Sequence, residues 1–424
     1  MTPTPHLPPL PPGPVAAPSS RFDVAIMGGG AVGLATAMAL ANDYHASIIV
    51  VEAECSLAAH QTGNNSGVIH SGLYYKPGSL RATLCTQGRN ALYQFCQEHS
   101  IPHDNCGKVV VATSDDELPA LDELLRRGIA NGLADLRRLS IDELREHEPH
   151  VAGIAGLFVR ETGIVDYKAL ANAYADVVRQ AGGHVRTSAQ VRHVTPTPNA
   201  IILHTTQGDF SAQGLINCAG LQSDRVARMC GLKPDARIVP FRGEYYRLAP
   251  DAWRFCKNLI YPVPNPAFPF LGVHFTRIIA GGVEAGPNAV LALARHGYSW
   301  TRLSPRDLLD TLTFPGFWRM ARKCWKAGLG EIHRSLSKNA FLKALQRLMP
   351  ELESKHLAPG GAGIRAQALD RTGNLLDDFA IQTAPRMIHV LNAPSPAATA
   401  SISIGRYIAQ TASSLLDLPQ LRPR

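Results

Sequence analysis

The segment from Phe22 to Gly33 constrains the fold of this chain more than any other part of its sequence. It reads Phe-Asp-Val-Ala-Ile-Met-Gly-Gly-Gly-Ala-Val-Gly, an apolar strand followed by glycines that include positions 28, 30 and 33. The G-x-G-x-x-G spacing is typical of a tight turn that leads into a helix and lets the backbone approach a pyrophosphate at the helix N-terminus. We therefore predict a dinucleotide site at Gly28, Gly30 and Gly33.

A second apolar strand strengthens the prediction of a dinucleotide site. Residues 47–51 are followed by Glu52, which lies about 20 residues beyond the glycine turn, where an acid binds the ribose hydroxyls. A carboxylate at this place disfavours a 2′-phosphate, so NADP is the least expected dinucleotide.

Length and charge indicate the number of domains and the kind of partner. The chain has 424 residues, 45% of them hydrophobic, which predicts two or three domains. Its net charge of +8 comes almost entirely from residues 301–350, where ten Lys and Arg outnumber three acids. Because the rest of the chain is nearly neutral, we expect no nucleic-acid partner, and one local basic surface needs an explanation.

The cysteines and the N-terminal residues indicate an intracellular protein. Eight cysteines are scattered without a C-x-x-C pair or metal-type spacing, so we expect reduced thiols and no metal site. Residues 1–20 are rich in proline and alanine and lack the features of a secretory signal, which predicts a disordered tail. We find no run of about 18 apolar residues that would span a bilayer, and we expect a cytoplasmic location.

The order of the predicted elements indicates an α/β fold of the α+β type with two interleaved domains. The predicted helices cover residues 32–42, 80–99, 167–181 and 398–416. The strands predicted after the first two cover residues 185–194, 200–205, 214–218, 243–248, 272–276, 360–369 and 387–391. The strand 214–218 leads into Ala219 and Gly220, which would return the backbone to the cofactor phosphates and make the nucleotide domain discontinuous.

The predicted elements divide the chain into alternating segments. The expected segments are a tail (1–20), three cofactor-binding segments (21–111, 166–237 and 359–424) and two substrate-domain segments (112–165 and 238–358), with the basic helical segment 301–350 inside the last. Alternating apolar and polar residues between 238 and 284 predict an antiparallel sheet that carries substrate-facing side chains on one face.

Four stretches carry a resemblance to a known family. They are His60–Tyr75 (HQTGNNSGVIHSGLYY), Pro240–Tyr246 (PFRGEYY), Phe270–Thr276 (FLGVHFT) and Asn392–Thr399 (NAPSPAAT). Together they resemble the L-2-hydroxyglutarate dehydrogenase/oxidase family of the D-amino-acid-oxidase-like superfamily, to which the chain is similar from about Arg21 onward. The resemblance implies FAD as the cofactor, a discontinuous Rossmann-like FAD-binding domain and an antiparallel-sheet substrate domain.

The resemblance also implies an enzymatic activity. It is the oxidation of L-2-hydroxyglutarate, a small dicarboxylic 2-hydroxy acid, to 2-oxoglutarate by hydride transfer to flavin N5, with electrons passed to membrane quinone or to oxygen. Two alternatives stay open. One is a related flavoprotein oxidase or dehydrogenase that acts on an amino acid or glycerol 3-phosphate, and the other is a non-catalytic FAD-bearing membrane scaffold.

Two loops are expected to contact FAD. The first is polar and follows the second strand, and its expected contacts are Thr62, Asn64, Asn65, Ser66 and Gly67. The alternative for these residues is a plain turn. The second, Asn392–Thr399, precedes the C-terminal helix, and the resemblance implies that its backbone N–H groups face the flavin pyrimidine end. Its expected cofactor-binding residues are Pro396, Ala397 and Thr399, of which Pro396 has no N–H to donate.

The expected proton acceptor is a histidine. His70 lies just past the first loop, where the resemblance places the chain beside the flavin ring, and an imidazole with an ordinary pKa of about 6.5 suits base catalysis near neutrality. His274 is the competing base or a hydrogen-bond donor to the substrate. A structural role is the alternative for a single histidine.

A dicarboxylate substrate requires cationic partners, because two carboxylates lose their water on binding. Arg365 is the expected bidentate clamp, at the place where related flavoproteins bind a substrate carboxylate. Arg242, Tyr245 and Tyr246 follow as further substrate-binding candidates. The alternatives are a salt bridge from Arg242 to Glu244 and core packing of one tyrosine, because adjacent strand residues point to opposite faces.

The basic segment has two interpretations. Residues 315–326 interleave aromatic and cationic side chains, and residues 341–348 continue with apolar side chains at helical spacing. Such helices either lie on an anionic bilayer or form a lid over the substrate domain, and both roles are compatible. Membrane contact suits an enzyme that reduces quinone, and it would place the protein on the inner face of the cell membrane.

Overall fold

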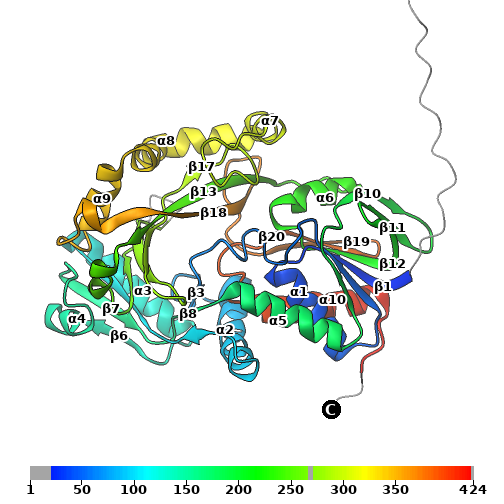
Figure 1. Ribbon diagram of the computed structural model, residues 1–424, viewed down its shortest axis with the longest axis horizontal. Helices are drawn as coiled ribbons and strands as arrows, with labels where there is room; N and C mark the ends of the chain where they lie inside the picture. Colours follow the sequence, from blue (N-terminus) through cyan, green and yellow to red (C-terminus); the bar gives the residue numbers. More distant parts are fainter. Residues whose placement is uncertain (1–20, 266–270, 422–424) are drawn as a thin grey trace, which may run out of the picture.

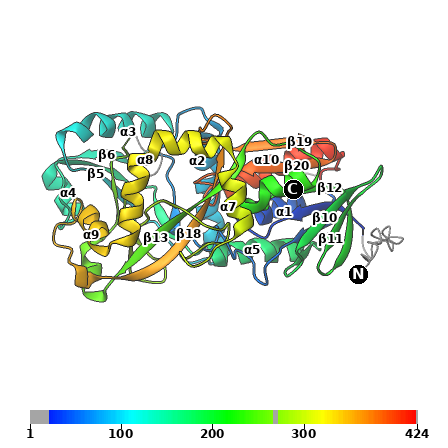
Figure 2. The same cartoon turned by 90° about the horizontal axis from the view of Figure 1, so that it is seen from above.

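The computed structural model describes residues 21–265 and 271–421 (Figure 1). The predicted tail at 1–20 and Phe270 of the third motif lie outside the described residues. The described chain forms two large sheets that lie side by side, with helices on their outer faces (Figures 1 and 2). The helices are α1 (Ala31–Asp43), α2 (Leu80–Glu98), α3 (Leu118–Ala130), α4 (Ile141–His147), α5 (Tyr167–Gln180), α6 (Ser223–Met229), α7 (Pro305–Leu312), α8 (Pro315–Leu336), α9 (Lys338–Gln346) and α10 (Ser401–Leu416).

The first sheet has eight strands, and parallel strands form its centre. Its strands are β1 (Arg21–Met27), β2 (Ile48–Val51), β9 (His184–Arg186), β10 (Val191–Pro196), β11 (Ile201–Thr205), β12 (Gly208–Asn217), β19 (Ala380–Ala384) and β20 (Met387–Asn392). They are ordered β10-β11-β12-β1-β2-β9, with β20 paired to β12 and β19 paired to β20. Strand β1 is parallel to both β2 and β12, and β12 is parallel to β20, so this sheet is assembled from three separated parts of the chain.

Burial on both faces explains the apolar run in β1. Val24 and Ile26 pack into one core cluster with residues of α1, α5 and α10, whereas Ala25 and Met27 pack into another on the opposite face. Successive strand residues point to opposite faces, so a central parallel strand covered on both sides is apolar throughout.

The predicted strand at 185–194 is two strands in the structure. Strand β9 ends at Arg186 and β10 begins at Val191, and between them Ser188 has a positive φ of 55°. A non-glycine residue in that left-handed region interrupts an extended strand, and sequence periodicity does not reveal it.

The second sheet has nine strands and is mostly antiparallel. Its strands are β5 (Lys108–Ala112), β6 (Leu136–Leu139), β7 (Ala155–Val159), β13 (Arg237–Leu248), β14 (Leu259–Pro262), β15 (His274–Arg277), β16 (Val283–Gly286), β17 (Val290–Leu291) and β18 (Leu357–Leu369). The long strands β13 and β18 pair along almost their full length. A small third sheet joins β3 (Val68–Ile69), β8 (Gly163–Val165) and β4 (His103–Asp104) between the two large ones.

Two strands lie across the segment boundaries that we expected. Strand β5 pairs with β7 and β14 in the second sheet, although the division at 111 assigned most of it to the cofactor-binding part. Strand β18 pairs with β13, although the division at 359 assigned most of it to the last cofactor-binding segment. Both are apolar strands whose partners lie far away in sequence, so their own residues do not reveal which sheet they join.

The basic segment folds as helices α7, α8 and α9 over the second sheet (Figures 1 and 2). Phe314 and Met320 are buried against Val239 and Leu369 of β13 and β18. In α9, Phe341 and Leu345 lie in a second buried cluster. The segment therefore packs over the second sheet.

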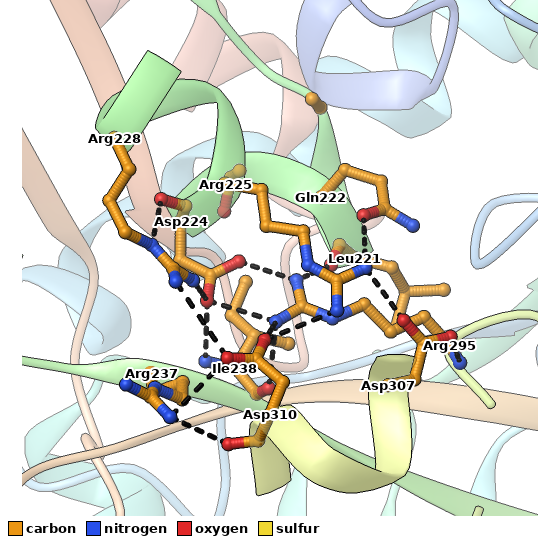
Figure 3. A network of polar contacts seen from close by, with 12 residues as sticks. Leu221, Gln222, Asp224, Arg225, Arg228, Arg237, Ile238, Arg295, Asp307 and Asp310 are labelled. Carbon is orange, nitrogen blue, oxygen red and sulfur yellow. Dashed lines mark hydrogen bonds and ion pairs between the residues drawn. The ribbon is translucent and has the colours of Figure 1, made fainter. Parts of the chain in front are cut away.

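A buried ionic cluster ties the two sheets together (Figure 3). Asp224 of α6 pairs with Arg295 through both guanidinium nitrogens and with Arg228 at 2.7 Å. Arg295 also donates to Asp310 of α7 at 3.0 Å, and its side chain is only 1% exposed. Helix α6 follows strand β12 of the first sheet, and α7 is one of the helices that lie over the second sheet. The cluster therefore joins the two sheets.

We expect Asp224→Asn to lower the free energy of unfolding by roughly 3–5 kcal/mol, because Arg295 would remain buried without its main counter-charge. Urea unfolding of the purified protein measures the change. Asp176→Asn is the matched control, since Asp176 is 60% exposed beside Arg179 and should contribute less than about 1 kcal/mol. Equal effects of the two substitutions would show that the cluster does not hold the sheets together.

Candidate active site

A cavity of about 1230 Å³ runs between the two sheets. Its walls come from the glycine turn, the loop after β2, the end of β12, strands β13 and β18, and the loop before α10. These segments lie far apart in the sequence and meet at the cavity. A cavity of this size is large enough for an extended ligand.

The glycine turn approaches strand β12 too closely for any side chain. Gly28 has a φ of +116°, and a Cβ added there would lie 2.4 Å from the carbonyl oxygen of Cys218. A Cβ on Gly33 would lie 2.1 Å from the carbonyl oxygen of Gly28. Gly28 and Gly30 line the cavity, whereas Gly33 does not and instead permits close packing of α1 on the turn.

Two side chains hold the turn and face the cavity. The carboxylate of Glu52, directly after β2, accepts hydrogen bonds from the backbone N–H groups of Gly29 at 2.6 Å and Glu54 at 2.9 Å. The hydroxyl of Thr62 accepts a hydrogen bond from the N–H of Ala31 at 3.0 Å, at the start of α1. Both residues line the cavity beside the glycine turn.

The polar loop after β2 is stabilised by its own amides. Asn64 donates to the carbonyls of Ala59 and His60, and Asn65 donates to those of Gln61 and Thr62. Asn64, Asn65 and Ser66 line the cavity, and Gly67 does not. The turn-forming and cavity-lining roles are therefore both present in this loop.

The loop before α10 closes the cavity on the other side. The hydroxyl of Thr399 accepts a hydrogen bond from the N–H of His70 at 3.0 Å and lies 3.0 Å from the hydroxyl of Tyr167. Thr399, Pro396 and Ala397 line the cavity. A residue near the C-terminus thus positions the backbone of the candidate base.

The arrangement fits a dinucleotide. The close approach of Gly28 to β12 leaves room for backbone only, and Glu52 and the N-terminus of α1 lie at the same edge of the parallel strands. Ala219 and Gly220, which follow β12, line the same part of the cavity. The carboxyl ends of parallel strands are where such folds hold a pyrophosphate.

His70 and His274 both line the cavity, at the end formed by the second sheet. Burial lowers the pKa of His70 to about 3, with further lowering by Lys108, Arg81 and His274. Burial lowers the pKa of His274 to about 3 as well. Both imidazoles are therefore neutral near pH 7 and have a nitrogen that can accept a proton.

The hydrogen bonds of the two histidines differ. The Nδ1 of His274 lies 2.8 Å from the carbonyl oxygen of Gly272, so Nδ1 carries the proton and Nε2 the lone pair. The Nε2 of His70 lies 3.3 Å from the hydroxyl of Ser395. The ring of His274 also stacks on Tyr261 at 3.9 Å, which fixes its orientation.

Arg365 and Tyr245 project from the β13–β18 pair into the cavity lining. Each acts electrostatically on the pKa of the other, so they lie close together. The Nη1 of Arg365 donates to the carbonyl of Asn288 at 3.3 Å, and an added Cβ on Gly243 would lie 3.2 Å from that nitrogen. Gly243 thus leaves space for the guanidinium.

Arg242 and Tyr246, the other two predicted substrate-binding residues, do not line the cavity. Arg242 is fully buried, with Nη2 2.9 Å from the Glu244 carboxylate and its guanidinium over the ring of Trp300. The ring of Tyr246 packs on Phe341. Residues 242, 244 and 246 share the face of β13 away from the cavity, which corrects the expectation for Arg242 and Tyr246.

Three residues at this end of the site were not predicted from the sequence. Tyr74 and Tyr261 line the cavity, and Lys108 is buried behind them with Nζ 4.4 Å from the centre of the Tyr74 ring. The available signal was a lysine at the head of the apolar run Val109–Ala112. A charged side chain at the start of a fully buried strand requires a specific environment.

The sequence and the structure both match known proteins. The model of the DAO family, described as FAD dependent oxidoreductase, matches residues 23–411. The L-2-hydroxyglutarate dehydrogenase of Indibacter alkaliphilus is 52% identical over 393 residues, which cover 92% of this chain and 98% of that protein. The L-2-hydroxyglutarate dehydrogenase of Escherichia coli K12 is 46% identical over 397 residues, which cover 93% of this chain and 94% of that protein.

One solved structure supports the fold. The L-alpha-glycerophosphate oxidase of Mycoplasma pneumoniae, with FAD bound, superposes with a TM-score of 0.77 at 22% identity, over 95% of this chain and 97% of that chain. An identity this low supports the shared architecture and not the substrate.

Stability should depend on pH through the neutral histidines. The folded pKa of His274 is about 3 and its unfolded value is about 6.5, so the unfolded chain binds the extra proton between these values and unfolding becomes easier as pH falls. Wild type should lose about 2 kcal/mol more than His274→Asn between pH 7 and pH 5. Urea unfolding at both pH values measures the difference, and parallel losses would contradict the buried, neutral state of His274.

Proposed function

We propose that this chain, which belongs to the DAO family of FAD-dependent oxidoreductases, oxidises L-2-hydroxyglutarate to 2-oxoglutarate. FAD is its cofactor. The proposal of the substrate rests on relatives at 46% and 52% identity that carry the name L-2-hydroxyglutarate dehydrogenase along almost their whole length.

The observation that carries the proposal is the composition of the cavity end formed by the second sheet. Arg365 lies there with two buried, neutral histidines, His70 and His274. A planar guanidinium binds a carboxylate through two parallel hydrogen bonds, and a neutral imidazole can take the hydroxyl proton of a 2-hydroxy acid. Residues of both kinds line the same cavity, which supports the proposal.

The chain's own residues take three roles in the reaction. Arg365 binds and orients the carboxylate next to the reacting carbon, and Tyr245 lies beside it. His70 accepts the hydroxyl proton, while His274 holds the substrate oxygen or replaces His70 as the acceptor. Bound FAD would supply the acceptor for the α-hydrogen and its two electrons. The glycine turn and the loop before α10 would hold FAD in the cavity.

The reaction requires an electron acceptor as its second substrate. The hydroxy acid loses two electrons and two protons as the C2–H and O–H bonds break and the C2=O double bond forms. We propose that these pass to a membrane quinone, giving a quinol, and less efficiently to oxygen, giving hydrogen peroxide.

The primary test is an anaerobic titration of the flavin absorbance. L-2-hydroxyglutarate should bleach the oxidised flavin, and its D-enantiomer, an amino acid and glycerol 3-phosphate should not. Bleaching by the amino acid or by glycerol 3-phosphate instead would indicate a related flavoenzyme with a different substrate. A flavin that dithionite reduces but none of these compounds bleaches would favour a non-catalytic scaffold.

An exposed face of α8 supports the proposal of membrane contact. Its apolar side chains recur at helical spacing, at Trp318, Trp325, Leu329, Ile332 and Leu336, and each is at least 41% exposed. Arg322 and Lys326 are exposed on the same face. We call these seven residues the α8 face. Aromatic and aliphatic side chains among cations are typical of a helix that lies in the headgroup region of an anionic bilayer.

Within residues 21–265 and 271–421, the helices are too short or too polar for any of them to cross a bilayer. Contact through the α8 face would therefore be peripheral. It would bring the substrate sheet beside the lipid phase in which quinones dissolve, because α8 packs over that sheet.

Arg365→Lys should reduce kcat/KM for L-2-hydroxyglutarate by roughly tenfold or more, because a point charge does not replace the planar two-bond contact. Steady-state kinetics with a soluble dye acceptor measure the loss. Arg371→Lys serves as the control, since Arg371 is exposed and outside the cavity lining. Unchanged kinetics of Arg365→Lys would remove Arg365 from the site.

The triple variant Trp318→Ser, Trp325→Ser and Leu329→Ser should bind vesicles of phosphatidylglycerol roughly tenfold more weakly than wild type, because it loses the buried apolar area. Co-sedimentation measures the binding, and activity with a soluble acceptor should not change. Tyr407→Ser on α10 is the control, since that ring is 41% exposed elsewhere. Equal vesicle binding by the triple variant and wild type would exclude the α8 face as the contact.

A further inference from the structure

Lys108 is a buried cation whose ammonium faces aromatic rings instead of a carboxylate. Its side chain stands at the head of β5 and the residue is 1% exposed. Nζ lies 4.4 Å from the centre of the Tyr74 ring and 5.1 Å from that of Tyr261. Among the described residues, no carboxylate lies within ion-pair distance of Lys108.

A buried ammonium without a counter-ion is unfavourable, and aromatic faces offset only part of that cost. Burial accordingly lowers the pKa of Lys108 to about 7. The nearby Cys85 of α2 slightly opposes this shift. A site that keeps such a group close to its titration point gains stability when an anion binds beside it.

The rings that cover Lys108 belong to the substrate end of the cavity. Tyr74 and Tyr261 line that end, as do His70 and His274, whose pKa values Lys108 lowers. The remaining cations that act on the two histidines are Arg81 and Arg365. Positive charge therefore surrounds this end of the cavity, and the groups that act on the two histidines and on Lys108 include no carboxylate.

The Tyr74 hydroxyl offers a route from Lys108 to a ligand. It is buried and makes no hydrogen bond within the described residues. Burial raises its pKa well above the ordinary value, so the hydroxyl keeps its proton and remains a donor. A cation over a phenol ring withdraws electron density and strengthens the O–H as a donor, and a buried donor without a partner favours a ligand that accepts.

We propose that Lys108 is the positioning residue for the second carboxylate of the substrate, acting through the Tyr74 ring that covers it, while Arg365 binds the first. This inference rests on the proposed function, because it explains why a five-carbon dicarboxylate is preferred to a monocarboxylate of equal length. Lys108 does not line the cavity, so its charge acts through the aromatic wall. 

The inference includes a pH dependence. The groups that face Lys108 are the rings of Tyr74 and Tyr261, the Cys85 thiol and the two histidines. The histidines stay neutral above pH 4, so in the range from 6 to 9 the lysine is the group that changes charge near pH 7. The preference for a dicarboxylate should fall as pH rises through that range.

The test compares Lys108→Met and Lys108→Arg with wild type. L-2-hydroxyglutarate is paired with L-2-hydroxyvalerate, which has the same five carbons and a methyl group in place of the distal carboxylate. The kcat/KM ratio of the two acids should fall roughly tenfold or more in Lys108→Met, mainly through KM of the dicarboxylate. Lys108→Arg should keep a high ratio and lose its decline between pH 6 and pH 9, since arginine stays charged. 

Controls separate a structural effect from the proposed one. Lys355→Met removes an exposed lysine and should change neither ratio nor pH profile. Flavin content and melting temperature report folding, and the shift of flavin absorbance on binding glutarate gives Kd without turnover. A folded Lys108→Met with the wild-type ratio and glutarate affinity overturns the inference. If Lys108→Met does not fold, a wild-type ratio that is constant from pH 6 to pH 9 overturns it.

Failure of the proposed function would look different. Wild type would then show no bleaching by L-2-hydroxyglutarate, before any variant is made. Glutarate binding that depends on Lys108 would in that case still support a dicarboxylate site.

Discussion

The parallel pairing of β1 with β2 and β12 is the interaction on which the rest of the structure depends. It brings the ends of three strands to one edge of the sheet, so that Gly28, Glu52 and Ala219 meet there although they lie far apart in sequence. The approach of Gly28 to the Cys218 carbonyl is so close that backbone alone fits. Hydrogen bonding within this sheet therefore creates the cofactor site directly, and the second sheet only needs to cover it.

The second sheet lines one end of the cavity because side chains alternate between the two faces of β13 and β18. Gly243 and Tyr245 face the cavity, whereas Arg242 and Glu244 form an ion pair on the other face. One face of the same strand thus lines the cavity and the opposite face supports the helices α8 and α9. The end of the cavity at the second sheet combines cations with neutral imidazoles, an arrangement that favours an anionic ligand. The buried pair of Asp224 and Arg295 fixes the cover to the cofactor domain.

Features that are local in sequence were predictable, and features that depend on register were not. The glycine spacing, Glu52 and the amphipathic helices correspond to elements in the structure because they depend on neighbouring residues. The family resemblance is confirmed by the match over residues 23–411. The side of β13 on which Arg242 would lie depended on its pairing with β18, and periodicity alone left both faces open. Lys108 was missed because the aromatic rings that accommodate it come from distant segments.

The discontinuity of the first sheet has a consequence for biosynthesis. Strand β1 is synthesised well before its partner β12 and before β20, which pairs with β12 and β19. Until then β1 exposes two apolar faces and an unpaired edge, the surfaces through which nascent chains aggregate. The loop from Pro396 to Thr399, which completes the cavity wall, is synthesised after all the strands of this sheet. The wall of the cavity is therefore incomplete until synthesis has passed this loop.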